Sequence, residues 1–270
     1  MTAIRPTDTA DTIVLVHGLW MTPLSWEKWI ERFEGYGFKV IAPTWPGLEG
    51  GVDALRMDSS PLEGLGIKEI VDHYERIIRA LPKKPIIMGH SFGGVFTQLL
   101  LDRGLGVAGV AIDSGPVQGV FRLPFSSLRA ARPVLGNPAN VRRAVPLTPE
   151  EFHYAFTNSL TAEESREVYD RYHVPASGRV LFQAAFANVN PKAVTKVDFT
   201  RDRAPLLLIA GGNDHIVPPS MNKENYKRYR KSPSVTEYVE FPGRTHYIVG
   251  QPGWEEVADK AVSWAVDHSV

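Results

Sequence analysis

The chain has 270 residues, of which 43% are hydrophobic and 22% charged, with 30 basic and 30 acidic side chains. These proportions are typical of a globular protein with one large core, and the balanced charge does not favour binding to nucleic acid or to an anionic membrane. The absence of cysteine excludes disulfides, cysteine-ligated zinc and thiol nucleophiles.

At the N-terminus, MTAIRPTDTAD lacks the apolar region of a signal peptide. No later run approaches the ~18 uninterrupted apolar residues of a membrane span. We therefore expect a cytoplasmic protein with no membrane span and no nucleic-acid partner. A small molecule is the expected partner, and the sequence leaves a homodimer open.

Short apolar runs alternate with segments of helical periodicity along most of the chain. The runs predict strands over 12–16, 38–43, 85–89, 107–113, 204–212 and 235–241, the last being polar enough for a sheet edge. The periodic segments predict helices within 24–37, 67–81, 95–104 and 254–268. This alternation predicts an α/β fold: a mostly parallel sheet of about six strands with helices on both faces.

Residues 117–200 interrupt this alternation, and we call them the cap segment. They contain several prolines and two capping boxes, Thr148 with Glu151 and Thr161 with Glu164, which predict short helices joined by irregular turns. We expect a helical cap, or lid, inserted into a core made of 1–116 and 201–270. The segment is rich in aromatic residues, most of which we expect to form its own small core. Candidates for a substrate pocket are Phe121, Phe125, Phe182 and Phe186.

The sequence Gly89-His90-Ser91-Phe92-Gly93 lies between a predicted strand and a predicted helix. A chain that reverses here strains the serine backbone, and glycines on both sides remove side chains that would collide. The serine hydroxyl is left exposed at the end of the sheet. Ser91 is therefore the candidate nucleophile, and the amide of Phe92 at the helix N-terminus is a candidate donor to an oxyanion.

A serine nucleophile requires a histidine base and a carboxylate that orients it. His246 follows the last predicted strand, and Asp214 follows the strand before it, at the end where parallel sheets place their sites. Asp113 follows an earlier strand and is the alternative acid. We favour Asp214.

The loop after the first strand, His17-Gly18-Leu19-Trp20, offers a second oxyanion donor. Gly18 allows the backbone to turn, so the amide of Leu19 is the candidate, and Trp20 would lie beside the pocket. We assign His17 and His90 to loop structure. The remaining histidines show no spacing that indicates a metal site, and we expect no metal or cofactor.

HGLW (17–20), GHSFGG (89–94), GGNDHIVP (211–218) and GRTHY (243–247) occur in an order and at a spacing that resemble the α/β-hydrolase superfamily, especially its small capped esterase-like members. The resemblance covers essentially the whole chain. It implies a triad of Ser91, Asp214 and His246, an oxyanion hole at Leu19 and Phe92, and a cap over 117–200. The N-terminal antiparallel strands common in the superfamily are missing or vestigial, so about six strands are expected rather than eight.

The function expected from this pattern is hydrolysis of carboxylic esters through an acyl-enzyme, with a small to medium hydrophobic substrate. A lactonase is the main alternative because a lactone is a cyclic ester. Carbon–carbon hydrolysis, hydroxynitrile cleavage and cofactor-free oxygenation use a similar triad. They remain alternatives because fold and triad do not fix the substrate. A slow-turnover ligand receptor on the same fold is the alternative from another class.

Overall fold

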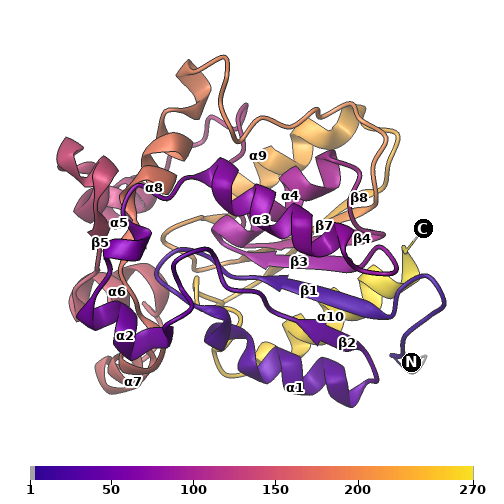
Figure 1. Ribbon diagram of the computed structural model, residues 1–270, viewed down its shortest axis with the longest axis horizontal. Helices are drawn as coiled ribbons and strands as arrows, with labels where there is room; N and C mark the ends of the chain where they lie inside the picture. Colours follow the sequence, from indigo (N-terminus) through magenta and orange to yellow (C-terminus); the bar gives the residue numbers. More distant parts are fainter. Residues whose placement is uncertain (1–3, 270) are drawn as a thin grey trace.

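The computed structural model of the protein describes residues 4–269 and is built on one parallel sheet (Figure 1). The strand order is β2-β1-β3-β4-β7-β8. The strands are β1 (Thr12–Val16), β2 (Lys39–Ile41), β3 (Ile86–His90), β4 (Ala108–Ile112), β7 (Leu206–Gly211) and β8 (Thr236–Phe241). All six predicted strands and the predicted fold class are confirmed.

Burial follows each strand's place in the sheet. The four central strands β1, β3, β4 and β7 are buried at every residue, as expected for parallel strands covered on both faces. The edge strands β2 and β8 are largely half-buried or exposed. The order of the central strands brings the C-terminal ends of β3, β4 and β7 side by side.

Helices cover both faces of the sheet (Figure 1). One face carries α1 (Glu27–Gly35) and α10 (Trp254–Asp267), whose side chains share a core that includes Trp29 and Ile13. The other face carries α3 (Ile67–Arg79), α4 (Phe92–Asp102) and α9 (Pro219–Arg228). No helix among the described residues is long and apolar enough to cross a membrane.

The cap segment forms short helices at one end of the sheet (Figure 1). These are α5 (Phe125–Leu135), α6 (Pro149–Phe156), α7 (Ala162–Tyr172) and α8 (Gly178–Ala185), with a small antiparallel pair, β5 (Ala144–Val145) and β6 (Ala176–Ser177). Both predicted capping boxes are confirmed, at the N-termini of α6 and α7.

A further helix, α2 (Gly51–Met57), was not anticipated from the sequence. It begins after Gly50 without a side-chain cap, and its short length gives a weak periodic signal. Arg56 donates from this helix to the main-chain carbonyls of Tyr169 and His173. The α2 region is therefore tied to the cap segment.

We expect Thr161→Ala to lower the free energy of unfolding by about 1 kcal/mol, because the Thr161 hydroxyl accepts the amide of Glu164 at the start of α7. Chemical denaturation measures this. Glu167→Ala on the exposed side of the same helix is the control and should change stability by less than about 0.5 kcal/mol. Equal effects of the two substitutions would contradict the capping role.

Candidate active site

Ser91 lies in a strained turn between β3 and α4. Its backbone has φ 57° and ψ −120°, outside the regions that L-residues ordinarily occupy. A side chain on Gly89 would place its Cβ 2.0 Å from the carbonyl oxygen of Gly93, and one on Gly93 would place it 1.9 Å from that of Val16. Both flanking glycines are therefore required by the close approach of neighbouring backbone.

The loop after β1 passes directly over Ser91. A Cβ built on Gly18 would lie 2.7 Å from the Ser91 Cβ, so only glycine allows this approach. Phe92 is the first residue of α4, where amides have no acceptor within the helix. Within the described chain, no acceptor is paired with the amides of Leu19 or Phe92. The two predicted oxyanion donors thus come from segments that meet at Ser91.

Asp214 and His246 form a buried pair. The Nδ1 of His246 donates to Oδ2 of Asp214 at 2.6 Å, and both side chains are fully buried. Oδ1 of Asp214 accepts the amides of Ile216 and Val217 at 2.7 and 2.9 Å. Asp214 therefore both closes its own turn and holds the imidazole of His246.

The loop that carries His246 is anchored on both sides. Thr245 donates its amide to the side-chain carbonyl of Gln251 at 2.9 Å, and the amide of Tyr247 donates to the carbonyl of Phe156 at 2.9 Å. The ring of Phe156 also contacts the imidazole edge-on, with centroids 4.9 Å apart. Helix α6 of the cap segment thus helps to fix the histidine.

No hydrogen bond joins the side chains of Ser91 and His246 among the described contacts. Within this part of the chain, Nε2 of His246 is buried and has no partner. The imidazoles of His90 and His246 lie 4.7 Å apart, centroid to centroid, and Ser91 directly follows His90. Hydrogen bonds of catalytic groups are often long before substrate binds.

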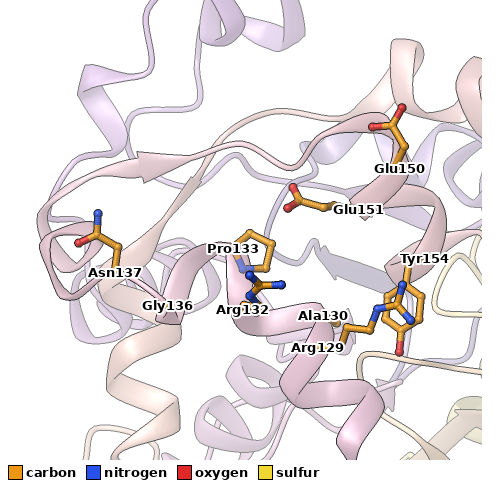
Figure 2. Close-up of a pocket in the computed structure, with 9 residues that line it drawn as sticks. All are labelled: Arg129, Ala130, Arg132, Pro133, Gly136, Asn137, Glu150, Glu151 and Tyr154. Carbon is orange, nitrogen blue, oxygen red and sulfur yellow. The ribbon is translucent and has the colours of Figure 1, made fainter.

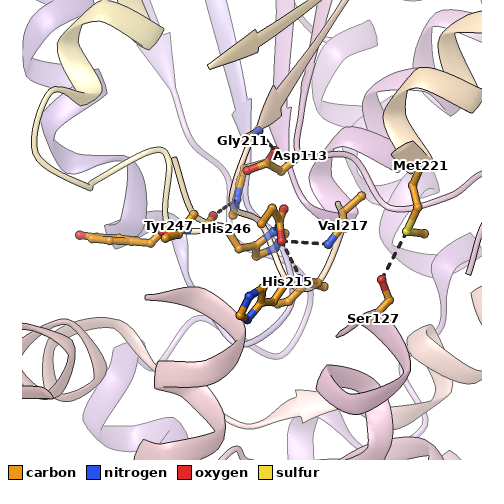
Figure 3. Close-up of polar contacts among 12 residues, drawn as sticks. Asp113, Ser127, Gly211, His215, Val217, Met221, His246 and Tyr247 are labelled. Carbon is orange, nitrogen blue, oxygen red and sulfur yellow. Dashed lines mark hydrogen bonds and ion pairs between the residues drawn. The ribbon is translucent and has the colours of Figure 1, made fainter. Parts of the chain in front are cut away.

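Asp113, the alternative acid, lies at the same end of the sheet. Its Oδ1 accepts the amide of Gly211 at 2.6 Å, and its side chain is fully buried (Figure 3). Burial, followed by the neighbouring charge of Asp214, raises the pKa of the Asp113 carboxyl well above its ordinary value. His246 pairs with Asp214, not with Asp113.

His17 and His90 shape the loops around the site. Nδ1 of His17 donates to the carbonyl of Gly18 at 3.0 Å, and Nε2 of His90 donates to the carbonyl of His246 at 2.7 Å. Burial lowers the pKa of His17 to about 4 and that of His90 well below its ordinary value. Both rings are therefore neutral near pH 7.

One group of side chains in residues 4–269 brings three ligand-type atoms together. One such atom each from His90, Asp113 and His246 lies within 4.8 Å of the others. One nitrogen of His246 is already bonded to Asp214, and one of His90 to a carbonyl. One nitrogen of each imidazole is thus already engaged, and all three side chains are buried.

A cavity of about 100 Å³ opens beside Ser91. Trp20 and Phe92 line it, as does Ser127, whose hydroxyl contacts the sulfur of Met221 at 3.5 Å (Figure 3). Trp20 donates from its indole to the carbonyl of Val145, which ties this wall to β5. Trp20 therefore lies in the cavity wall, and its role in substrate binding stays a prediction.

The four phenylalanines expected in the pocket do not line this cavity. Phe121, Phe125 and Phe186 are 65, 80 and 58% exposed, and Phe182 packs against Phe186. The lining from α5 and α8 consists instead of aliphatic and small residues: Ser127, Ala130, Ala131, Leu135, Leu181, Ala184 and Ala185. Paired alanines facing the site were the sequence signal, and attention to aromatic residues missed it.

A second, open cleft of about 530 Å³ lies within the cap segment (Figure 2). Arg129 and Arg132 line it together with Glu150 and Glu151, so the charges are mixed. The guanidinium of Arg129 stacks over the ring of Tyr154 at 3.9 Å. This cleft contains none of the predicted catalytic residues.

Comparisons with known proteins agree on the fold. The model of the alpha/beta hydrolase family matches residues 13–260. A search of curated proteins gives no match.

Several solved structures share this fold. The monoacylglycerol lipase of Paleococcus ferrophilus is 24% identical, with a TM-score of 0.66 over 97% of this chain and 96% of that one. Polyneuridine aldehyde esterase is 19% identical, with a TM-score of 0.67 over 94 and 99% of the two chains. An extracellular alpha/beta-hydrolase from Paenibacillus is 17% identical, with a TM-score of 0.68 over 94 and 98%.

We expect Gly93→Ala to lower the free energy of unfolding by about 3 kcal/mol or more, because the new methyl group would overlap the carbonyl of Val16. Chemical denaturation measures the loss. Gly35→Ala is the matched control, since no atom lies within 4 Å of its added Cβ, and it should be neutral or slightly stabilising. An unchanged stability of Gly93→Ala would contradict the packing described for the Ser91 turn.

Proposed function

The chain belongs to the alpha/beta hydrolase family, and from this membership and the geometry at Ser91 we propose that it is a serine hydrolase of carboxylic esters. The observation that carries the proposal is a buried Asp214–His246 pair at the same end of the sheet as a strained, glycine-flanked serine that faces an apolar cavity. The similarity in fold to a monoacylglycerol lipase and to polyneuridine aldehyde esterase is consistent with ester chemistry.

In the proposed mechanism, the Ser91 hydroxyl attacks the ester carbonyl and Nε2 of His246 accepts its proton. Asp214 holds Nδ1 of the imidazole, which keeps Nε2 free to accept and stabilises the imidazolium that forms. A neutral His90 at 4.7 Å adds no competing positive charge. The buried position of the pair strengthens this electrostatic support.

The tetrahedral intermediate places negative charge on the former carbonyl oxygen. The amides of Leu19 and Phe92 would donate to it, with support from the N-terminus of α4. His246 then protonates the departing alcohol, and a water molecule activated by the same histidine releases the acid from the acyl-enzyme. No cofactor or metal is needed for these steps.

The proposed substrate is a small ester with an apolar group. The cavity beside Ser91 is lined chiefly by aliphatic and small side chains, and its volume of about 100 Å³ favours a short chain. We also propose that residues 117–200 act as a cap, because α5 and α8 supply much of this lining. The shape of the cavity then sets the substrate size.

The first test is steady-state hydrolysis of p-nitrophenyl esters from acetate to laurate. We expect kcat/KM to be highest for the short esters and to fall by about 10³-fold or more in Ser91→Ala. Ser60→Ala, at an exposed position far along the chain from the site, is the control. A folded wild type without activity on the whole series would overturn the ester proposal, and lactones would be tested next.

We expect Leu181→Ala to move the preference toward longer acyl chains, because Leu181 lines the cavity. The ratio of kcat/KM for hexanoate over butyrate should rise by about tenfold. Val180→Ala is the matched control: this neighbour on α8 is buried in the core away from the cavity, so its loss should reduce stability and leave the ratio unchanged. A change of the ratio in both variants would indicate general loosening of α8 rather than a pocket wall.

A further inference from the structure

Asp113 is a buried carboxyl group that the proposed mechanism does not use. It follows β4, and its amide donates to the carbonyl of Ile209 in β7 at 2.8 Å. Its φ of 44° lies in the left-handed region, where aspartate and asparagine are tolerated better than most residues. The backbone and the Gly211 amide together fix this side chain at the C-terminal end of the sheet.

The two oxygens of Asp113 have different surroundings. Oδ1 accepts the amide of Gly211, whereas Oδ2 is buried and has no partner within the described residues. A carboxylate oxygen of Asp113 lies within 4.8 Å of a nitrogen of His246, and Nδ1 of that same imidazole is bonded to Asp214 at 2.6 Å, so the two carboxyl groups share one buried cluster. Two buried carboxylates this close cannot both ionise without a large cost.

The other titratable groups around Asp113 do not supply a compensating charge. His90 from the end of β3 is neutral because burial lowers its pKa. His246 from the loop after β8 is already paired with Asp214. Tyr238 in β8 stays protonated, since burial chiefly, and its hydrogen bond to the Glu240 carboxylate in addition, raise its pKa.

From this arrangement we infer that Asp113 is a protonated positioning residue whose Oδ2–H donates a hydrogen bond to the carboxylate of Asp214. The proton satisfies the one unpartnered oxygen of Asp113 and removes a buried negative charge. With this proton in place, each hydrogen bond made by Asp113 and Asp214 has one donor and one acceptor.

This bond would complete the set of donors around Asp214. Its carboxylate would then accept from the amides of Ile216 and Val217, from Nδ1 of His246 and from Asp113. With its rotation fixed on every side, Asp214 would hold His246 in one orientation. This catalytic consequence rests on the proposed function. The proton that Asp113 donates to Asp214, which we call the shared proton, does not.

Infrared difference spectroscopy of the whole protein at neutral pH tests the protonation directly. Asp113→Asn keeps the shape of the side chain, an acceptor for Gly211 and a donor toward Asp214, but it cannot ionise. We expect the wild type to show the carbonyl band of a buried carboxylic acid, and this band to be absent in Asp113→Asn. A wild type without the band, or a band that persists in the variant, would overturn the inference.

The pH dependence of stability gives a second readout that needs no activity. A native Asp113 that keeps its proton above its ordinary pKa makes the folded state bind more protons than the unfolded state, so stability falls as pH rises through that range. Asp113→Asn cannot ionise and so does not lose stability in this way. The free energy of unfolding of Asp113→Asn minus that of the wild type should therefore rise with pH above the ordinary carboxyl range. A difference that does not change with pH would contradict the shared proton.

Activity separates the two proposals. We expect Asp113→Gly, which fits the left-handed backbone but removes the donor, to lower kcat/KM on short esters about ten- to a hundredfold, and Asp113→Asn to recover most of it. Equal losses in both would overturn the positioning role. If Ser91→Ala keeps its activity while the infrared band depends on Asp113, the proposed function fails and the shared proton stands. If Ser91→Ala loses activity but the infrared band does not depend on Asp113, the proposed function stands and only the proton on Asp113 is refuted.

Discussion

The site depends on how closely the backbone packs around Ser91. Gly18, Gly89 and Gly93 occupy places where a single added carbon would meet another chain segment at 2.7 Å or less. These contacts hold Ser91 at a φ of 57° that it would otherwise leave. The strain is supported by the central strands β1, β3 and β4, which are buried throughout. The most deeply buried part of the sheet therefore presents the serine.

The second half of the site is built on loops, and other contacts give it rigidity. The loop after β7 carries Asp214, whose carboxylate accepts main-chain amides of its own turn. The loop after β8 carries His246 and is held by the side chain of Gln251 and the carbonyl of Phe156. Burial makes the Asp214–His246 pair sensitive to its surroundings, because charges removed from water interact strongly. A buried neighbour such as Asp113 can then influence the imidazole without touching a substrate.

The sequence was sufficient for the sheet because buried parallel strands are continuous apolar runs, and the six runs correspond to the six strands. It also pointed to Ser91, Asp214 and His246, since each lies shortly after the C-terminal end of a strand. The Asp214–His246 contact agrees with this expectation, and the catalytic roles remain proposals. The cavity wall was harder to predict. Which faces of α5 and α8 turn toward Ser91 depends on packing between segments far apart in the chain, so the exposed Phe121, Phe125 and Phe186 resembled pocket residues by composition alone.

The residues of the cap segment do not have a hydrophobic core of their own. Phe152, Phe156 and Val180 belong to the same buried cluster as Val14 and Val16 of the sheet and residues of α3 and α4. Cutting the chain at 117 and 200 would expose the core residues that share this cluster as well as the underside of the cap helices. Exchange of this segment between related proteins would therefore have to carry matching changes in the core residues beneath it, so new substrate preferences should arise more readily by point substitution on α5 and α8 than by recombination of whole segments.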